Sequence, residues 1–209
     1  MNPLTQTPSP DDFSNPSPRR LMHTRRIESQ GFRREDGLWD IEARIIDSKP
    51  FAYHEPYRGQ RETESDVHNI AIRLTLDDDF VVRDIEVLMP AVPYPSCAGA
   101  IPNFKQLIGA KVGAGWRKAV QAVVGSTKGC THARELLFPM ATVAFQTLFG
   151  WEDEAESAQE KARRAQRERL RGEQAGRPHF LDGCHSWASD GEVVAALYPQ
   201  FSTRNKPQG

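Results

Sequence analysis

The stretch His68-Asn69-Ile70-Ala71-Ile72-Arg73-Leu74-Thr75-Leu76 alternates large aliphatic residues with polar or small ones. Alternation with a period of two residues is typical of a β-strand that buries one face. Three acidic residues, Asp77-Asp78-Asp79, follow it, and the apolar-rich run Phe80–Leu88 comes next. Because Asp favours turns, this arrangement predicts an antiparallel β-hairpin. The ligand spacing of a calcium-binding loop is missing, so the three carboxylates are assigned to the turn.

A further strand is predicted upstream of the hairpin. The segment Leu38–Asp47 also alternates, follows the turn signal Glu35-Asp36-Gly37 and ends before Lys49-Pro50. Between this strand and the hairpin, Ala52–Asp66 is polar and rich in charged residues. We predict that it forms a long loop that could cover a binding site.

Beyond Pro90 the spacing of apolar residues changes to that of helices. Helices are predicted at Ile101–Ala110, Gly115–Val124 and Thr131–Phe149, the last being the core helix. Pro139 lies inside this third helix and is expected to kink or split it, because proline removes a main-chain hydrogen bond. The predicted fold class is therefore α+β, an antiparallel sheet of about three strands backed by helices.

Composition divides the 209-residue chain into four parts. Residues 1–18 are rich in Pro, Ser, Thr, Asn and Asp and are predicted to be a disordered tail, because they offer little to bury. Residues 19–150 are the predicted α+β core domain. Residues 151–176, in which acidic residues precede basic ones, are predicted to be a charged spacer helix. Residues 177–209 contain enough apolar residues to predict a C-terminal lobe that docks on the core.

Charge and hydropathy limit the classes of partner. The formal net charge is -1 and the pI is about 6.6, which gives no overall attraction to nucleic acid or to anionic membranes. The basic residues between Arg19 and Arg26 lack interleaved aromatic residues, so we expect a solvated or partner-facing edge there. No apolar run approaches the roughly 20 residues of a membrane span, and the N-terminus lacks the pattern of a secretion signal. We therefore expect a cytoplasmic protein whose partner is an unidentified small molecule or protein, with a homo-oligomer as an open option.

Thiol and imidazole groups give the clearest indication of chemistry. Cys130, His132 and Glu135 lie within two turns of the predicted start of the core helix. A helix N-terminus favours a thiolate, and Cys97 precedes another predicted helix in the same way. Thiolate and imidazole are ligands for zinc or iron. We therefore predict a zinc or iron site that serves metal or sulfur handling or metal-assisted catalysis. The candidate ligands are Cys97, Cys130, His132 and His68. Cys184 and His185 are weaker candidates.

Two other interpretations of these residues stay open. In a thiol-dependent enzyme, Cys130 would be the nucleophile and His132 or His185 the base, with Glu135 as a further catalytic candidate. In a non-catalytic interaction module, the cysteines would pack as small apolar groups, and His132 and Glu135 would form an ordinary ion pair on one helix face. The cysteines are three, an odd number, and lie far apart in the sequence, so they offer no disulfide framework and are expected to be reduced.

Several phrases of the sequence resemble an uncharacterised bacterial domain-of-unknown-function family. They are Arg26-Ile27-Glu28, Asp36-Gly37-Leu38-Trp39-Asp40-Ile41-Glu42, Ile72-Arg73-Leu74-Thr75, Gly129-Cys130-Thr131-His132 with Glu135-Leu136-Leu137, and Ala144-Phe145-Gln146-Thr147. The resemblance covers the chain from about residue 22, and Cys184-His185-Ser186-Trp187 looks like the terminal element of that family. It implies no activity.

A remoter resemblance is to iron-sulfur scaffold proteins of the NifU type. The order of a ligand at a strand start, a hairpin and two cysteines before helices is similar here. The resemblance implies that Cys97 and Cys130 match the second and third scaffold cysteines and that His68 falls near the first. A histidine where the scaffold has a cysteine makes a mononuclear zinc or iron site on a related fold the expected outcome.

Overall fold

The computed structural model describes residues 17–148, 158, 161–162, 178 and 180–204. The chain divides into two compact units, residues 1–149 and 150–209, which are described separately. The predicted tail falls almost entirely outside the described residues, and so does most of the predicted spacer helix. The docking of the C-terminal lobe stays a prediction.

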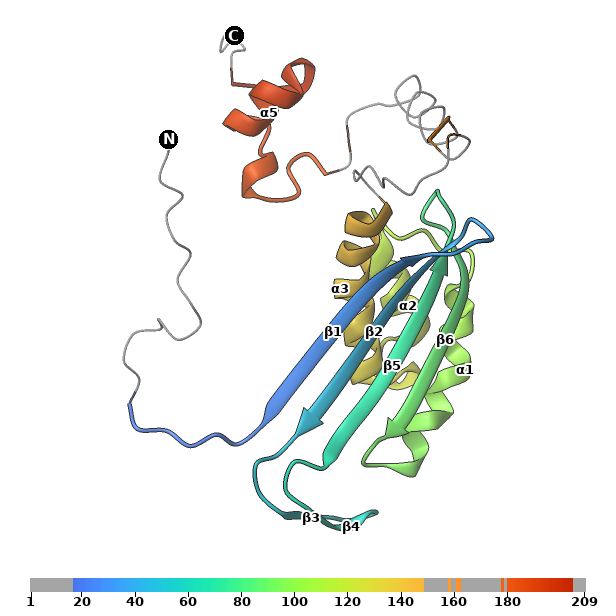
Figure 1. Ribbon diagram of the computed structural model, residues 1–209, viewed down its shortest axis with the longest axis vertical. Helices are drawn as coiled ribbons and strands as arrows, with labels where there is room; N and C mark the ends of the chain where they lie inside the picture. The colour runs from blue at the N-terminus through green and yellow to red at the C-terminus, as the bar shows by residue number, and fades with distance from the viewer. Residues whose placement is uncertain (1–16, 149–157, 159–160, 163–177, 179, 205–209) are drawn as a thin grey trace. The chain divides into compact units, whose positions relative to one another are not determined.

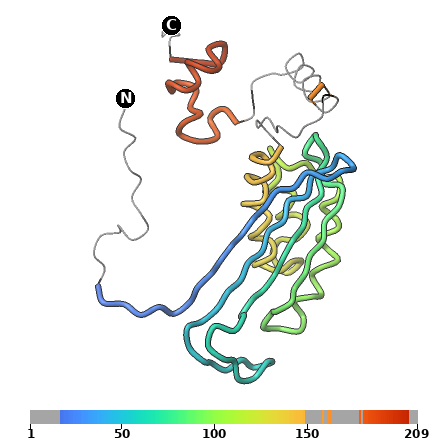
Figure 2. The backbone as a smooth tube through the Cα atoms, in the orientation of Figure 1, coloured from blue at the N-terminus to red at the C-terminus, as the bar shows by residue number. Residues whose placement is uncertain are grey.

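The first unit is built on an antiparallel sheet of four strands in the order β1-β2-β5-β6 (Figures 1 and 2). The strands are β1 (Thr24–Arg33), β2 (Trp39–Ser48), β5 (Asp66–Leu76) and β6 (Val82–Ala91). The predicted hairpin and the predicted upstream strand are confirmed as β5, β6 and β2. The prediction of about three strands omitted β1, which lies at the edge and is mostly exposed on both faces.

The predicted long loop contains a small hairpin of β3 (Tyr53–Glu55) and β4 (Gly59–Arg61). Arg58 fixes this hairpin to the start of β5. Its guanidinium donates hydrogen bonds to the buried carboxylate of Glu55 and to the main-chain carbonyls of Asp66 and Val67. The segment is therefore held close to the sheet end where β5 begins.

Helical segments cover one face of the sheet (Figure 1). They are η2 (Pro95–Ala100), α1 (Ile101–Phe104), η3 (Lys105–Leu107), α2 (Trp116–Val124), η4 (Ser126–Lys128) and α3 (Thr131–Leu148). Their apolar side chains meet those of the central strands in one core, which includes Ile41, Ile45, Ile70, Ile72, Leu74, Leu136, Leu137 and Met140. This is the α+β architecture expected from the sequence.

Helix α3 packs over β1 and β2 and begins at the end of the sheet where β2 ends and β5 begins. It runs without a break through Pro139, so the expected split of this helix is wrong. The buried indole of Trp116 donates to the carbonyl of Leu137, which ties α2 to α3 beside the proline. The close packing also explains Gly31 in β1, since a Cβ there would lie 1.8 Å from Oγ1 of Thr147.

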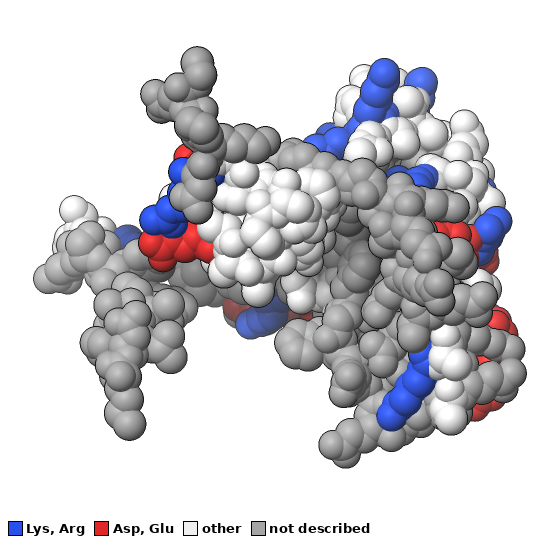
Figure 3. All heavy atoms as spheres, turned by 90° about the horizontal axis from the view of Figure 1, so that it is seen from above, with Lys and Arg blue, Asp and Glu red and all other residues white. Residues whose placement is uncertain are grey.

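The second unit holds η5 (His185–Trp187), α5 (Glu192–Leu197) and η6 (Pro199–Phe201). The rings of Phe180, Trp187 and Tyr198 pack against one another. Among the described residues, no helix is long and apolar enough to cross a membrane. Figure 3 shows Lys and Arg side chains in blue and Asp and Glu side chains in red for the described residues on one face.

Candidate metal centre

A cluster of ionisable side chains lies at the end of the sheet where β2 ends and β5 begins, the lower end in Figure 1. Asp47 and His68 are directly opposite each other in the β2–β5 register. Residues paired in this way place their side chains on the same face. Beyond this pair the register shifts, so that Ser48 pairs with Asp66, and such irregularities are common beside functional sites.

The third member of the cluster comes from the first turn of α3, which covers this face of the sheet. One ligand atom each from Asp47, His68 and His132 lie within 4.8 Å of one another. Nδ1 of His68 lies 2.9 Å from Oδ2 of Asp47, and the rings of His68 and His132 stack with centroids 3.7 Å apart. The structure therefore brings together the two histidines that were predicted from the sequence and adds a carboxylate.

Arg25 of β1 completes the arrangement from the other side of Asp47, which it faces in the β1–β2 register. Its Nε and Nη2 donate to the two carboxylate oxygens of Asp47 at 2.8 and 2.9 Å. Its Nη1 donates to Glu135 of α3 at 2.8 Å. His23 places Nε2 3.2 Å from Oδ1 of Asp47. Glu135, a catalytic candidate in the sequence, thus borders the cluster through Arg25.

The partners of Asp47 keep its carboxyl group ionised. The carboxylate is only 1 % exposed, and burial, the largest single influence, acts to raise the pKa of Asp47. The hydrogen bond and positive charge of Arg25, aided by His68 and His23, outweigh burial and hold the pKa below its ordinary value. Asp47 therefore stays ionised at neutral pH.

The two stacked histidines are shifted toward the neutral form. Burial lowers the pKa of His68, more strongly than Asp47 raises it, and Arg25 and Arg58 also act to lower it. Burial is also the main cause that lowers the pKa of His132, followed by the neighbouring His68 and Arg25. Neutral imidazole is the form that binds a metal ion.

The cysteine ligands predicted from the sequence are not part of this cluster. Cys130 directly precedes α3, where its carbonyl accepts a hydrogen bond from the amide of Arg134, and it packs against the hydrophobic core. Cys97 lies in η2, and Cys184, with His185, lies exposed in the second unit. Among the described residues, Asp47, His68 and His132 are the only group of three or more potential ligands whose ligand atoms lie close enough together to hold one metal ion. The physical reason for the difference is that the core uses Cys130 for packing.

Asp47, Arg25 and His23 were not recognised as site residues from the sequence. One available signal concerned Asp47, because it continues the alternation of Ile41, Ala43 and Ile45 and so belongs to the core-facing side of β2. A charged residue at a buried strand position needs a partner. The partners themselves depend on strand register, which the local pattern does not give.

Residues 23–146 match the family model described as a protein of unknown function (DUF2889). The chain belongs to the DUF2889 family. The matched segment of the DUF2889 domain begins at His23 and contains the whole cluster, whereas Cys184 and His185 lie outside it. Neither the curated proteins nor the solved structures gave a match to the chain. The resemblance to NifU-type scaffold proteins therefore has no support from these comparisons.

Proposed function

We propose that the DUF2889 domain binds a zinc or iron ion through Asp47, His68 and His132. The observation that carries this proposal is the meeting of two neutral imidazoles and one buried carboxylate within 4.8 Å. Two histidines and a carboxylate are a donor set used for catalytic zinc and for non-haem iron(II). Ligand atoms on one tetrahedral zinc ion are about 3.3 Å apart, so a small contraction of the cluster would suffice.

Charge balance also supports a cation at this place. Asp47 and Glu135 contribute two negative charges and Arg25 one positive charge, while neutral His68 and His132 contribute none. The nearby Arg58 is paired with Glu55, so that pair adds no net charge. The result is one net negative charge beside the largely buried carboxylate. A divalent ion would therefore be attracted electrostatically as well as by its ligands.

Three protein ligands leave at least one coordination position for water or a substrate. A metal ion in such a site activates bound water or polarises a substrate oxygen. We therefore favour metal-assisted catalysis over sulfur handling, since sulfur handling was inferred from cysteines that lie outside the cluster.

The test is a metal titration of purified, chelator-treated protein with Zn²⁺, and with Fe²⁺ in the absence of oxygen. We expect about one ion per chain, and at least about a 100-fold loss of affinity in His68→Ala and in His132→Ala. His54→Ala is the matched control, because His54 is an exposed histidine in β3. Unchanged affinity in both cluster variants, with circular dichroism showing that they fold, would overturn the proposal.

A thiol-dependent activity of Cys130 is the second candidate. It is favoured by the position of Cys130 directly before the 18-residue helix α3 and two residues before His132, its candidate base. This candidate predicts that iodoacetamide modifies Cys130 faster than the exposed Cys184 at neutral pH. Protein with neither bound metal nor a fast-reacting Cys130 would instead support the interaction-module interpretation.

A further inference from the structure

The carboxylate of Asp47 already has a full set of partners. A carboxylate offers about four lone-pair positions. In Asp47, Oδ1 faces Nε of Arg25 at 2.8 Å and Nε2 of His23 at 3.2 Å, and Oδ2 faces Nη2 of Arg25 and Nδ1 of His68, both at 2.9 Å. A metal ion that binds Asp47 directly must therefore displace at least one of these groups.

Arg25 is the partner best placed to leave. Among the residues that the structure describes, it is the one permanent cation that contacts Asp47, so an arriving divalent ion repels it. Its side chain is 31 % exposed, whereas that of His68 is 12 % exposed and packed against His132. His23 is more exposed, at 46 %, but its imidazole can itself bind an ion, whereas a guanidinium has no lone pair to offer. One of the three nitrogens of Arg25 is already bonded to Glu135, whose side chain is 48 % exposed. A rotation toward Glu135 would keep the guanidinium paired.

We propose that Arg25 acts as an internal competitor of the metal ion, occupying Asp47 in the metal-free protein and moving to Glu135 when the ion binds. This inference rests on the proposed function and adds its regulation. The guanidinium prevents an uncompensated buried carboxylate before the metal arrives. It also sets the metal affinity below the value that the three ligands alone would give.

The competitor role predicts opposite changes in Zn²⁺ affinity for substitutions of Arg25 and of Glu135. Arg25→Gln should tighten Zn²⁺ binding by about tenfold or more, although it weakens the metal-free fold, because the competing cation is gone. Glu135→Gln should weaken Zn²⁺ binding several-fold, because displaced Arg25 loses its second acceptor. In the double variant the Glu135 substitution should have a clearly smaller effect, because only the electrostatic attraction of its charge for the ion remains to be lost.

The experiment is a Zn²⁺ titration of the full chain against a competing chelator, for wild type, Arg25→Gln, Glu135→Gln and the double variant. Arg26→Gln is the control, because it removes the same charge from the neighbouring, exposed residue of β1. A merely structural role of Arg25 would weaken binding in Arg25→Gln rather than tighten it. The melting temperature with and without Zn²⁺ gives a second readout, in which Zn²⁺ should raise that of Arg25→Gln more than that of wild type.

The possible results separate the two proposals. If the wild type binds Zn²⁺ through the three ligands and folded Arg25→Gln binds it equally well or more weakly, the competitor role is wrong. The proposed metal site is then unaffected. Wild-type protein that binds no metal overturns both. If Arg25→Gln does not fold, Glu135→Gln decides, because unchanged affinity in that variant contradicts the competitor role. An equal loss of affinity from Glu135→Gln in the wild-type and Arg25→Gln backgrounds would mean that Glu135 acts independently of Arg25 and would also overturn it.

Discussion

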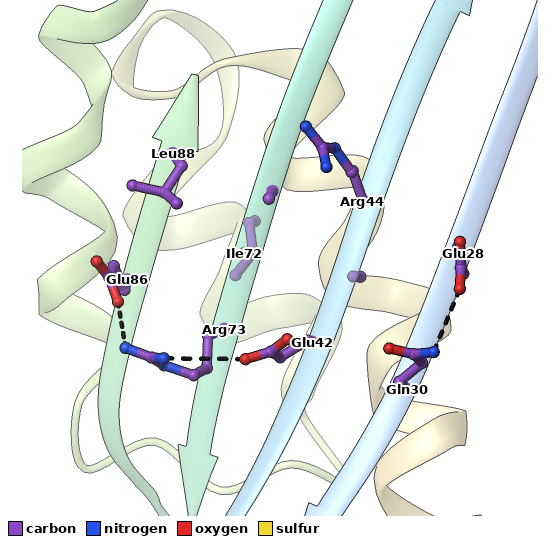
Figure 4. A pocket seen from close by; sticks show the side chains of 10 residues that line it. Glu28, Gln30, Glu42, Arg44, Ile72, Arg73, Glu86 and Leu88 are labelled. Atoms are coloured by element: carbon purple, nitrogen blue, oxygen red, sulfur yellow. Dashed lines mark hydrogen bonds and ion pairs between the residues drawn. The ribbon is translucent and has the colours of Figure 1, made fainter. Parts of the chain in front are cut away.

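The two faces of the sheet carry similar charged triplets in different surroundings. On the face away from the helices, Arg73 of β5 lies opposite Glu42 of β2 and Glu86 of β6 and pairs with both (Figure 4). On the helix-covered face, Asp47 lies opposite Arg25 of β1 and His68 of β5 and pairs with both. In each case strand register places one charged residue between two partners.

Burial makes the difference between the triplets. The side chains of the Arg73 triplet are 44–47 % exposed, in a shallow hollow of about 300 Å³. Water can solvate each of these groups alone, so pairing gains little. Asp47 is 1 % exposed, and α3 adds His132 from above. A cross-strand charge triplet therefore becomes a candidate site only where a third element excludes water and contributes further donors.

The largest difference is expected when one carboxylate of each triplet is neutralised. Asp47→Asn should lower the free energy of unfolding of the metal-free protein by about 3 kcal/mol, because it leaves Arg25 and His68 without a buried anion. Glu86→Gln on the open face should lower it by less than about 1 kcal/mol. Urea unfolding at neutral pH measures both. Equal effects of the two substitutions would show that burial does not separate the triplets as argued.

A smaller effect is expected from pH, again only on the covered face. The folded-state pKa values of His68 and His132 lie below the ordinary value of 6.5, so the unfolded chain binds more protons as pH falls through that value. The free energy of unfolding of the metal-free protein should therefore be constant above about pH 7 and decrease below about pH 6.5, by at most about 1.4 kcal/mol per pH unit for each histidine. The lowered pKa of Asp47 adds a decrease of the same sign in more acidic solution.

The pH dependence can be assigned with single variants. His132→Phe keeps an aromatic ring for stacking on His68 but removes one titrating group, so the decrease between pH 6.5 and 5 should become shallower. His54→Phe changes an exposed histidine of β3 and is the control. Urea unfolding across this pH range is the measurement, and an equally shallow slope in the control would contradict the assignment to the cluster.

The fold was predictable where a strand or helix has one buried face. β2, β5 and β6 each alternate between the core and the other face of the sheet, and α3 carries a clear apolar stripe. Edge strand β1 gave no such signal, because its residues are mostly exposed on both faces and main-chain pairing with β2 defines it. The helix α3 was predicted correctly, but Pro139 does not split it, because packing holds this helix together despite one missing hydrogen bond.

The candidate site was predictable only in part. His68 and His132 were identified because each stands at the start of a predicted element, and the structure places both at one end of the sheet. Asp47 and Arg25 were missed because their roles depend on the pairing of three strands, which no local pattern encodes. The predicted cysteine ligands lie outside the Asp47–His68–His132 cluster, since the chemistry of a thiol says nothing about whether it faces a site or the core.

The smallest effect is expected from Arg73, which tests whether the open face is only a solvated surface. Arg73→Gln removes the centre of the exposed triplet and should change the free energy of unfolding by less than about 0.5 kcal/mol at low salt. In about 1 M NaCl the change should approach zero, because the screening length falls to about 3 Å. Urea is the suitable denaturant, since guanidinium would itself screen the charges. A loss of more than about 2 kcal/mol that persists in high salt would mean that the Arg73 triplet behaves like the Asp47 cluster, and burial by α3 would then no longer explain why one face carries the candidate site.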